Sequence, residues 1–356
     1  VAHDRSSQVV GHRRALSARR QLIDQALAPS SGCRGFTGPV PPPLLMSAYA
    51  AVSLWGMSRA TNHTDISTGS LGSRYGRVTG VKRTHRKDGQ AMEIVDIDGI
   101  DIAYEQLGSG PPLLLLTGLG GVGRAWGSLI ERFAEEFTVI VPDHRGTGSS
   151  SKPDSGYTIE ALAADMAGLV RHVGLGPAHV SGSSTGGALA QVMALDHPGS
   201  VASLVLVSSW AGPDPYFLRQ FELRKSILAT QGVAAYTRTS ALFLFAPSVT
   251  ATRPDVVDSW LERATAKPGD PDIMEQRIDM IMAHDQRDRL AQVTAPTLVI
   301  VGAEDICTPP YASRELERLI PESRLVMLSG GHLIYLEQPD EFFQTVSGFL
   351  AAAPTA

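Results

Sequence analysis

Residues 178–191 read AHVSGSSTGGALAQ, and they join an apolar strand to a helix through a turn rich in small residues. The turn reverses the chain within about three residues, and its pattern Gly-Ser-Ser-Thr-Gly matches G-x-S-x-G with only Ser184 at the centre. Glycines two positions before and after are needed where the central residue is strained, because a Cβ at either flank would meet the neighbouring strand or helix. The stretch therefore predicts a strand, a tight turn and a helix, with Ser184 as a candidate nucleophile.

Three further hydroxyls surround Ser184. Ser181 lies within the strand, and Ser183 and Thr185 hold the flanking positions of the turn. Hydroxyls at such positions usually bond to nearby backbone, and we interpret these three in that way. A serine hydroxyl is a weak nucleophile near neutral pH, so the hypothesis requires a base, an acid that orients the base, and donors for an oxyanion.

An acid and a base follow two later strand patterns. Asp305 lies in AEDICTPP after the apolar run TLVIVG, and His332 follows two glycines after RLVMLSG. Taken alone, such an aspartate is commonly a helix cap, and such a histidine commonly has no special role. The order Ser, Asp, His, with each residue at the carboxyl end of a strand, favours a catalytic triad of Ser184, Asp305 and His332.

Backbone N–H groups are the expected oxyanion donors, because the fold positions them without a side chain. One is Thr185, at the positive end of the helix after the turn. The other is Leu119, in the loop Thr-Gly-Leu-Gly-Gly at residues 117–121. The same loop superficially resembles a nucleotide-binding G-x-G-x-x-G turn. We disfavour that interpretation because Asp143, after the next strand, is followed by HRGTGSS and lacks the usual context of a ribose-binding acid.

Short apolar runs alternate with amphipathic stretches from residue 92 onward, and this alternation predicts an α/β fold with a mostly parallel sheet of about eight strands and helices on both faces. The expected strands are residues 92–98, 101–108, 112–118, 138–143, 178–183, 203–209, 297–302 and 324–330. The expected helices outside the long insertion are residues 126–136, 159–173, 187–196, 311–319 and 339–352. The first two strands, joined by DGID, read as an antiparallel hairpin at the sheet edge.

A long insertion without strand patterns interrupts the alternation, and we predict a helical cap at residues 210–290 inside a core formed by residues 92–209 and 291–356. Its helical stripes occupy residues 216–230, 233–244, 256–265 and 273–284. Aromatic residues suit a small closed pocket, and an arginine such as Arg219, Arg224 or Arg238 could meet a substrate carboxylate. The substrate-binding candidates are Gly118, Trp210, Phe217, Arg219 and Phe221. The alternative is that the aromatic residues only pack and the arginines are solvated.

Residues 1–91 differ in composition from the rest of the chain. They carry 13 Lys and Arg against 4 Asp and Glu, a net charge of +9, whereas the remainder carries 18 against 32, a net of −14. They contain no Glu and no sustained period. We predict a disordered basic extension, with a basic arm for an acidic surface as the alternative.

The composition of the chain also limits which binding partners and which cellular compartment are expected. The acidic patterned region argues against a nucleic-acid partner. The apolar run at residues 44–57 is shorter than the roughly 20 residues that span a bilayer, so no membrane partner is expected. Cys33 and Cys307 lie in different units and predict no disulfide framework, which favours the cytoplasm. The expected partner is a small-molecule substrate, and the oligomeric state stays open.

Five motifs together resemble the α/β-hydrolase fold superfamily: TGLGG, PDHRGTGSS, GSSTGG, VGAEDICTPP and SGGHLIYLEQPDEF. The resemblance covers residues 92–352 and is greatest to hydrolases similar to 3-oxoadipate enol-lactonase. It implies the same triad and oxyanion donors, with no metal or organic cofactor. Two positions depart from many relatives, which have His where this chain has Thr117 and Ser183. These departures make transfer of a relative's substrate unsafe.

The resemblance implies a serine-dependent hydrolase of a small carboxylic ester or enol-lactone that acts through an acyl-enzyme. Carbon–carbon hydrolysis of ring-fission products on the same triad is one alternative. A ligand-sensing homologue that hydrolyses slowly or not at all is another. Family members with an Asp nucleophile are disfavoured because position 184 is Ser.

Overall fold

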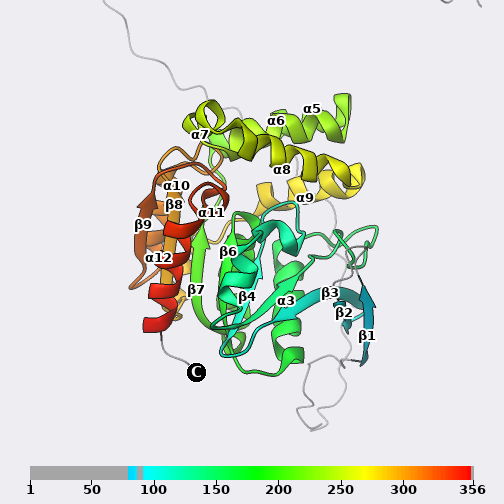
Figure 1. Cartoon of the computed structure of the whole chain (residues 1–356), viewed down its shortest axis with the longest axis vertical. Coiled ribbons are helices and arrows are strands. Elements are labelled where there is room, and N and C mark those ends of the chain that lie inside the picture. Colours follow the sequence, from blue (N-terminus) through cyan, green and yellow to red (C-terminus); the bar gives the residue numbers. More distant parts are fainter. Residues whose placement is uncertain (1–78, 86–90, 354–356) are drawn as a thin grey trace, which may run out of the picture. The chain divides into compact units, whose positions relative to one another are not determined.

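The computed structural model describes residues 79–85 and 91–353, which form a central sheet with helices on both faces (Figure 1). The strands are β1 (Thr79–His85), β2 (Ala91–Ile97), β3 (Ile100–Leu107), β4 (Pro112–Leu116), β5 (Thr138–Pro142), β6 (Ala178–Ser183), β7 (Val201–Val207), β8 (Thr297–Gly302) and β9 (Arg324–Leu328). Their order is β1-β2-β3-β5-β4-β6-β7-β8-β9. The first three pairs in this order, β1–β2, β2–β3 and β3–β5, are antiparallel. All the remaining pairs, from β5–β4 to β8–β9, are parallel. The predicted fold class is confirmed.

One strand falls where the sequence predicted disorder. Strand β1 pairs antiparallel with β2 although it belongs to the segment 1–91. Its sequence TGVKRTH is rich in basic residues, which are also typical of a basic tail. Lysine and arginine also protect exposed sheet edges, so the same residues suit an edge strand. For Thr79–His85 the expectation of disorder is wrong, and residues 1–78 lie outside the described part of the chain.

The helices are α2 (Leu129–Phe133), α3 (Ile159–Val173), α4 (Thr185–Asp196), α5 (Pro215–Gln231), α6 (Val233–Leu244), α7 (Pro247–Thr252), α8 (Pro254–Ala266), α9 (Pro271–Ala283), α10 (Pro310–Leu319), α11 (Ile334–Glu337) and α12 (Pro339–Ala352). Helices α3, α4 and α10 pack on one face of the sheet, and α2 and α12 on the other. The apolar run of β4 supplies both cores, because Leu114 and Leu116 face the first set of helices whereas Leu113 and Leu115 face the second.

Five helices, α5 to α9, lie between β7 and β8, and we call them the helical insertion. Figure 1 shows α5 to α8 gathered beyond one end of the sheet. Helix α5 begins at Pro215 because the Asp214 side chain accepts a hydrogen bond of 2.7 Å from the N–H of Phe217. Asp270 caps α9 in the same way, accepting from Asp272 and Ile273. These two caps fix the residues at which α5 and α9 begin.

Sheet topology brings the predicted site loops together. Strands β4 and β6 are parallel neighbours, with Leu116 opposite Gly182, so the loops that follow them are adjacent. Strands β8 and β9 are also neighbours, with Gly302 opposite Leu328. The chain leaves β4 toward β5 on one side and leaves β6 toward β7 on the other. A ligand crevice forms at the carboxyl ends of the strands where the connections diverge in this way.

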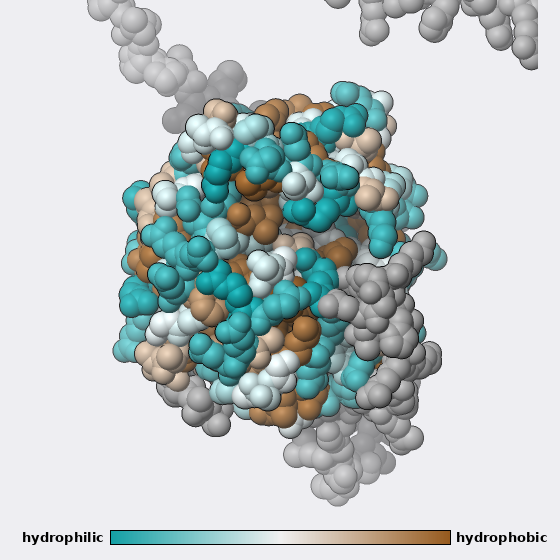
Figure 2. All heavy atoms as spheres, in the orientation of Figure 1, coloured by the Kyte–Doolittle hydropathy of each residue, from teal (hydrophilic) through white to brown (hydrophobic). Residues whose placement is uncertain are grey.

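Polar and apolar residues are interspersed over the surface seen in Figure 2. The large apolar side chains that are most exposed include Leu223 and Leu242, both on the helical insertion. Among residues 79–85 and 91–353, no helix combines the length and apolar character that crossing a membrane requires.

Candidate active site

Ser184 occupies the sharp turn between β6 and α4. Its backbone has φ 54° and ψ −115°, outside the conformations that residues with a Cβ usually adopt. The turn is held at both ends, since the Ser184 N–H donates to Val207 O at 2.8 Å and the Ser184 carbonyl accepts from Gly187 and Ala188. Backbone strain of this kind stores on the order of 1–3 kcal/mol and persists only where surrounding structure enforces it.

Accessibility distinguishes Ser184 from the neighbouring hydroxyls. Ser181, Ser183 and Thr185 are at most 1% exposed, whereas Ser184 is half-buried. The side-chain hydroxyl that remains open to a ligand is therefore the one at the centre of the turn.

Two glycines permit this turn because neighbouring backbone comes very close. A Cβ on Gly182 would lie 2.2 Å from the Gly186 carbonyl oxygen, and a Cβ on Gly186 would lie 2.2 Å from the Leu116 carbonyl oxygen. Both distances are far below van der Waals contact, so any larger residue would displace the helix or the neighbouring strand. The structure thus has the strand–turn–helix context that a G-x-S-x-G motif requires.

Asp305 and His332 form a buried pair between the loops after β8 and β9. His332 Nδ1 lies 2.9 Å from Asp305 Oδ2, and the two residues are at most 2% exposed. Asp305 Oδ1 accepts from the N–H groups of Cys307 and Thr308 at 2.8 and 2.9 Å. The Thr308 hydroxyl donates to Asp305 Oδ2 at 3.0 Å. These contacts fix the carboxylate toward the imidazole.

The electrostatics of the pair favour a protonated imidazole. Burial alone would lower the pKa of His332, but the Asp305 carboxylate and Cys307 together act in the opposite direction, and the pKa of His332 is raised. A proton held at Nδ1 against Asp305 leaves Nε2 as the nitrogen able to accept another proton. The described contacts of Ser184 do not include a hydrogen bond to His332.

The loop after β4 lies directly against Ser184. A Cβ built on Gly118 would be 3.4 Å from Ser184 Cβ and 3.9 Å from Ser184 Oγ. Neither the Leu119 N–H nor the Thr185 N–H donates to another group within residues 79–85 and 91–353. Thr185 is the first residue of α4, where the helix dipole adds partial positive charge. Both N–H groups are therefore free to receive an anionic oxygen.

Arg277 on α9 braces this loop, and the sequence analysis missed it. The side chain is 1% exposed, and its Nε and Nη2 both donate to the Leu119 carbonyl, at 3.1 and 3.0 Å. Nη1 donates to the carbonyl of Arg145 at 3.0 Å. Burial lowers the pKa of Arg277 to about 10, so the group stays charged at neutral pH. The available signal was an arginine in the apolar stripe of α9, between Ile273 and Met280.

Glu337 connects the histidine loop to the helical insertion. One carboxylate oxygen accepts from the N–H of Gly331 at 2.6 Å, and the other accepts from the N–H of Ala246 at 2.9 Å. Burial raises the pKa of Glu337. The Leu333 N–H also donates to Leu244 O at 3.0 Å. These contacts set the position of the backbone that carries His332.

The substrate-binding candidates divide into two groups. Gly118 lies beside Ser184, and Trp210, Phe217 and Phe221 form a buried stack with ring centroids 4.7 and 4.6 Å apart. Arg219 is exposed on the outer side of α5, so its assignment to the site is not supported. The helical period explains the difference, because residues 217, 221 and 224 share the inner face of α5 and residue 219 does not.

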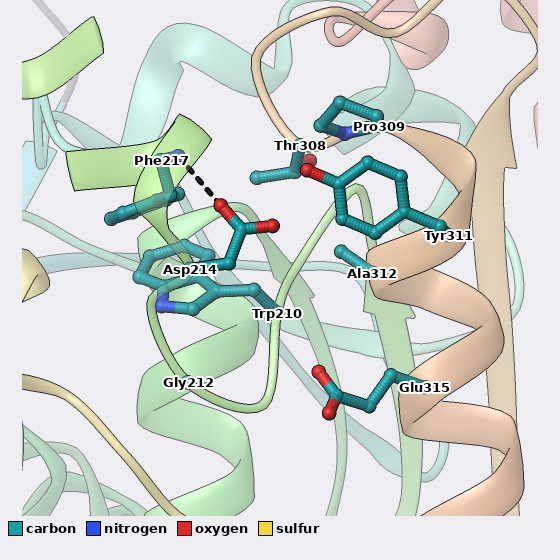
Figure 3. Close-up of a pocket in the computed structure, with 9 residues that line it drawn as sticks. All are labelled: Trp210, Gly212, Asp214, Phe217, Thr308, Pro309, Tyr311, Ala312 and Glu315. Atoms are coloured by element: carbon teal, nitrogen blue, oxygen red, sulfur yellow. Dashed lines mark hydrogen bonds between the residues drawn. The ribbon is translucent and has the colours of Figure 1, made fainter. Parts of the chain in front are cut away.

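A small pocket adjoins this stack (Figure 3). Its lining residues are Trp210, Gly212, Asp214, Phe217, Thr308, Pro309, Tyr311, Ala312 and Glu315. Figure 3 shows Asp214, Thr308 and Tyr311 turned toward one another across it. The lining includes neither Ser184 nor His332, and Thr308 connects the pocket to the Asp305–His332 pair. Within the described residues, no group of three or more His, Cys, Asp or Glu side chains is placed to hold a metal ion.

Comparison with proteins of related sequence identifies the family. A family model described as alpha/beta hydrolase fold matches residues 111–339. A protein of Azorhizobium caulinodans named "Putative carbamate hydrolase RutD" is 36% identical over 250 residues, covering 70% of this chain and 94% of that protein. A protein of Caulobacter sp. strain K31 with the same name is 32% identical and covers 73% and 98%.

The structure is also similar to solved structures of hydrolases. The enol-lactonase from Burkholderia xenovorans LB400 is 26% identical, with a TM-score of 0.66, covering 71% of this chain and 98% of its own. A thermophilic esterase from Thermogutta terrifontis, with malate bound, is 29% identical, with a TM-score of 0.65, covering 77% and 98%. The resemblance drawn from the five motifs is confirmed: the chain belongs to the α/β-hydrolase fold family and is a hydrolase.

Proposed function

We propose that this hydrolase uses Ser184, His332 and Asp305 as a catalytic triad on a small carboxylic ester or lactone. One observation carries the proposal: a half-buried hydroxyl on a strained turn lies at the same carboxyl end of the parallel strands as a buried imidazole held by a carboxylate. The similarity to an enol-lactonase and an esterase supports this substrate class.

The mechanism assigns a step to each group. Ser184 Oγ attacks the substrate carbonyl carbon while His332 Nε2 takes its proton, and the carbonyl oxygen becomes an oxyanion that accepts from the N–H groups of Leu119 and Thr185. His332 then passes the proton to the leaving oxygen as the carbon–oxygen bond breaks. Water, deprotonated by His332 Nε2, then attacks the acyl-enzyme carbonyl carbon. The acyl–Oγ bond breaks, and His332 returns the proton to Ser184 Oγ as the acid leaves. Asp305 holds the imidazole throughout.

The helical insertion is proposed to act as a cap that encloses the substrate. Trp210, Phe217 and Phe221 supply a buried apolar surface next to Thr308, the residue in contact with the Asp305–His332 pair. Enclosure would exclude bulk water from the site while the substrate is bound.

Carbamate hydrolysis is a second candidate, favoured by the 36% identity to the RutD protein of Azorhizobium caulinodans. The attack on a carbamate carbonyl needs the same triad and the same oxyanion donors. The two candidates differ in the leaving group and in contacts within the pocket.

A labelling experiment and a substrate panel test the proposed function. A fluorophosphonate probe should label Ser184, identified by peptide mass spectrometry, and a panel of small esters, lactones and carbamates should show turnover with at least one class. Absence of labelling together with absence of turnover in folded protein would favour a ligand-sensing homologue. Turnover only of carbamates would select the second candidate.

Replacing Gly118 with alanine should lower kcat/KM about 100-fold, because a methyl group would stand where the substrate carbonyl approaches Ser184. The neighbouring atoms lie at 3.4 Å or more, so folding should tolerate the change. Gly120→Ala is the matched control, since a Cβ there meets nothing within 4 Å. Equal kinetics for the two variants would contradict the placement of substrate against Gly118.

Replacing Arg277 with lysine should lower kcat about 10- to 100-fold with a smaller change in KM. Lysine keeps the charge but cannot direct two N–H groups at the Leu119 carbonyl. The exposed arginine of α8, Arg263, provides the control variant Arg263→Lys. A lower Tm with an unchanged kcat would show that Arg277 acts on stability alone.

A further inference from the structure

Arg224 is a buried cation with no carboxylate among its described partners. The side chain is 3% exposed on the inner face of α5. Its Nη2 donates to the hydroxyls of Tyr236 and Ser240 at 3.2 and 3.0 Å, and Nη1 lies 3.8 Å from Cys307 Sγ. Its Nε has no hydrogen-bond partner in the described part of the chain. The guanidinium also lies 4.5 Å from the ring centroid of Phe221.

Three other arginines among residues 92–353 have a carboxylate or backbone carbonyl oxygens as partners. Arg124 pairs with Glu105, and Arg145 binds both oxygens of Asp165. The fully buried Arg277 is surrounded by backbone carbonyl oxygens. Burying a charge without a counter-charge is strongly unfavourable, so an unpaired cation at this position needs a reason other than stability.

The position of Arg224 supplies that reason. Cys307, whose sulfur it contacts, donates its N–H to Asp305 Oδ1, and the other oxygen of that carboxylate holds His332 Nδ1. A single residue, Cys307, therefore lies between Arg224 and the Asp305–His332 pair. Gln220, one turn earlier on α5, donates to the Cys307 carbonyl and leaves its own Oε1 without a partner in the described residues. The inner face of α5 thus presents unused polar atoms beside the triad.

We propose that Arg224 binds a carboxylate of the substrate, at the end remote from the bond that is cleaved. The substrate class is then a small ester or lactone that retains a free carboxylate, such as a monoester of a dicarboxylic acid. A carboxylate would accept from the free Nε and replace the missing counter-charge. This inference rests on the proposed function and adds the charge of the substrate to it.

Two chromogenic esters of equal chain length test the inference. Mono(4-nitrophenyl) glutarate carries a terminal carboxylate where 4-nitrophenyl pentanoate carries a methyl group. The wild-type protein should prefer the glutarate in kcat/KM. Arg224→Gln should lower kcat/KM for the glutarate about 10- to 100-fold and change the value for the pentanoate by no more than about twofold. Arg263→Gln should change neither.

Stability provides a second readout. Removing an unpaired buried charge should leave Tm unchanged or raise it, and Arg224→Met should behave in the same way. A structural role would instead lower Tm in both variants and reduce turnover of both esters equally. Should the variants fail to fold, glutarate should inhibit the wild-type hydrolysis of the pentanoate competitively, and the uncharged glutaramide should not.

The outcomes separate this inference from the proposed function. Hydrolysis of both esters without a preference, or a preference that survives in Arg224→Gln or is lost only in Arg219→Gln, overturns the role of Arg224 and leaves the triad in place. No hydrolysis and no fluorophosphonate labelling overturns the triad. In that case carboxylate binding is decided by whether glutarate raises the Tm of the wild-type protein but not of Arg224→Gln.

Discussion

Replacing Ser184 with alanine is expected to lower kcat by roughly 10⁵- to 10⁶-fold, because the attacking oxygen is removed and the remaining groups act as a unit with it. The variant should fold, since alanine meets the same backbone strain at φ 54° and the turn bonds to Val207, Gly187 and Ala188 are made by the backbone. Ester turnover, fluorophosphonate labelling and Tm measured on the same preparation check all three points.

Ser181→Ala is the matched control, three residues earlier on strand β6, which leads into the turn. Ser181 is fully buried, and its hydroxyl has no hydrogen-bond partner among the described residues, so alanine should leave turnover within about twofold and Tm unchanged or slightly higher. A Ser184→Ala protein that retained full turnover would remove the nucleophile from the mechanism.

Replacing Asp305 with asparagine is expected to lower kcat about 10⁴-fold, the size of the effect that the same change has in a serine protease. The Asn carbonyl can still accept from the N–H groups of Cys307 and Thr308, so the loop should keep its shape. The Asn NH₂ group would face His332 Nδ1, however, and force the imidazole into the other tautomer. Circular dichroism and Tm close to wild type would separate this loss from unfolding.

The pH dependence of kcat/KM should change in a defined direction. His332 acts as a base only when neutral, so wild-type activity falls as pH drops through the pKa that Asp305 raises. In Asp305→Asn the carboxylate is absent while burial still lowers the pKa, so the acidic limb should move to lower pH. A limb that stayed in place would show that another group controls it.

Local pattern was sufficient to predict the elements that carry the proposed triad. The G-x-S-x-G pattern identified Ser184 because the need for each glycine arises from backbone packed against the turn. In the structure, Gly182 and Gly186 each lie too close to neighbouring backbone to carry a Cβ. Asp305 and His332 were found because each directly follows an apolar strand of a parallel sheet. The placement of all three depends on strand order, which alternating strands and helices already restrict.

Residues that act across the chain were not predictable in the same way. Arg277 meets Leu119, and Glu337 meets Ala246, through contacts that join positions 158 and 91 residues apart. No local period marks such a pairing. Arg219 and Arg224 could not be separated until the register of α5 showed which of them faces inward. Strand β1 was missed because a basic edge strand and a basic tail have the same composition.

The contact between Arg277 and the Leu119 carbonyl has a consequence for how a substrate would enter. Because α9 is tied to the backbone that flanks Ser184, the insertion cannot swing away as one rigid lid without disturbing that backbone. Admission would then depend on motion of the helices that are less firmly seated, such as α8, which buries only Val257 where α9 buries five residues. Backbone amides should accordingly exchange with deuterium more slowly in α9 than in α8. Such a difference would mean that one part of the helical insertion moves to admit substrate while α9 stays fixed to the Ser184 side of the site.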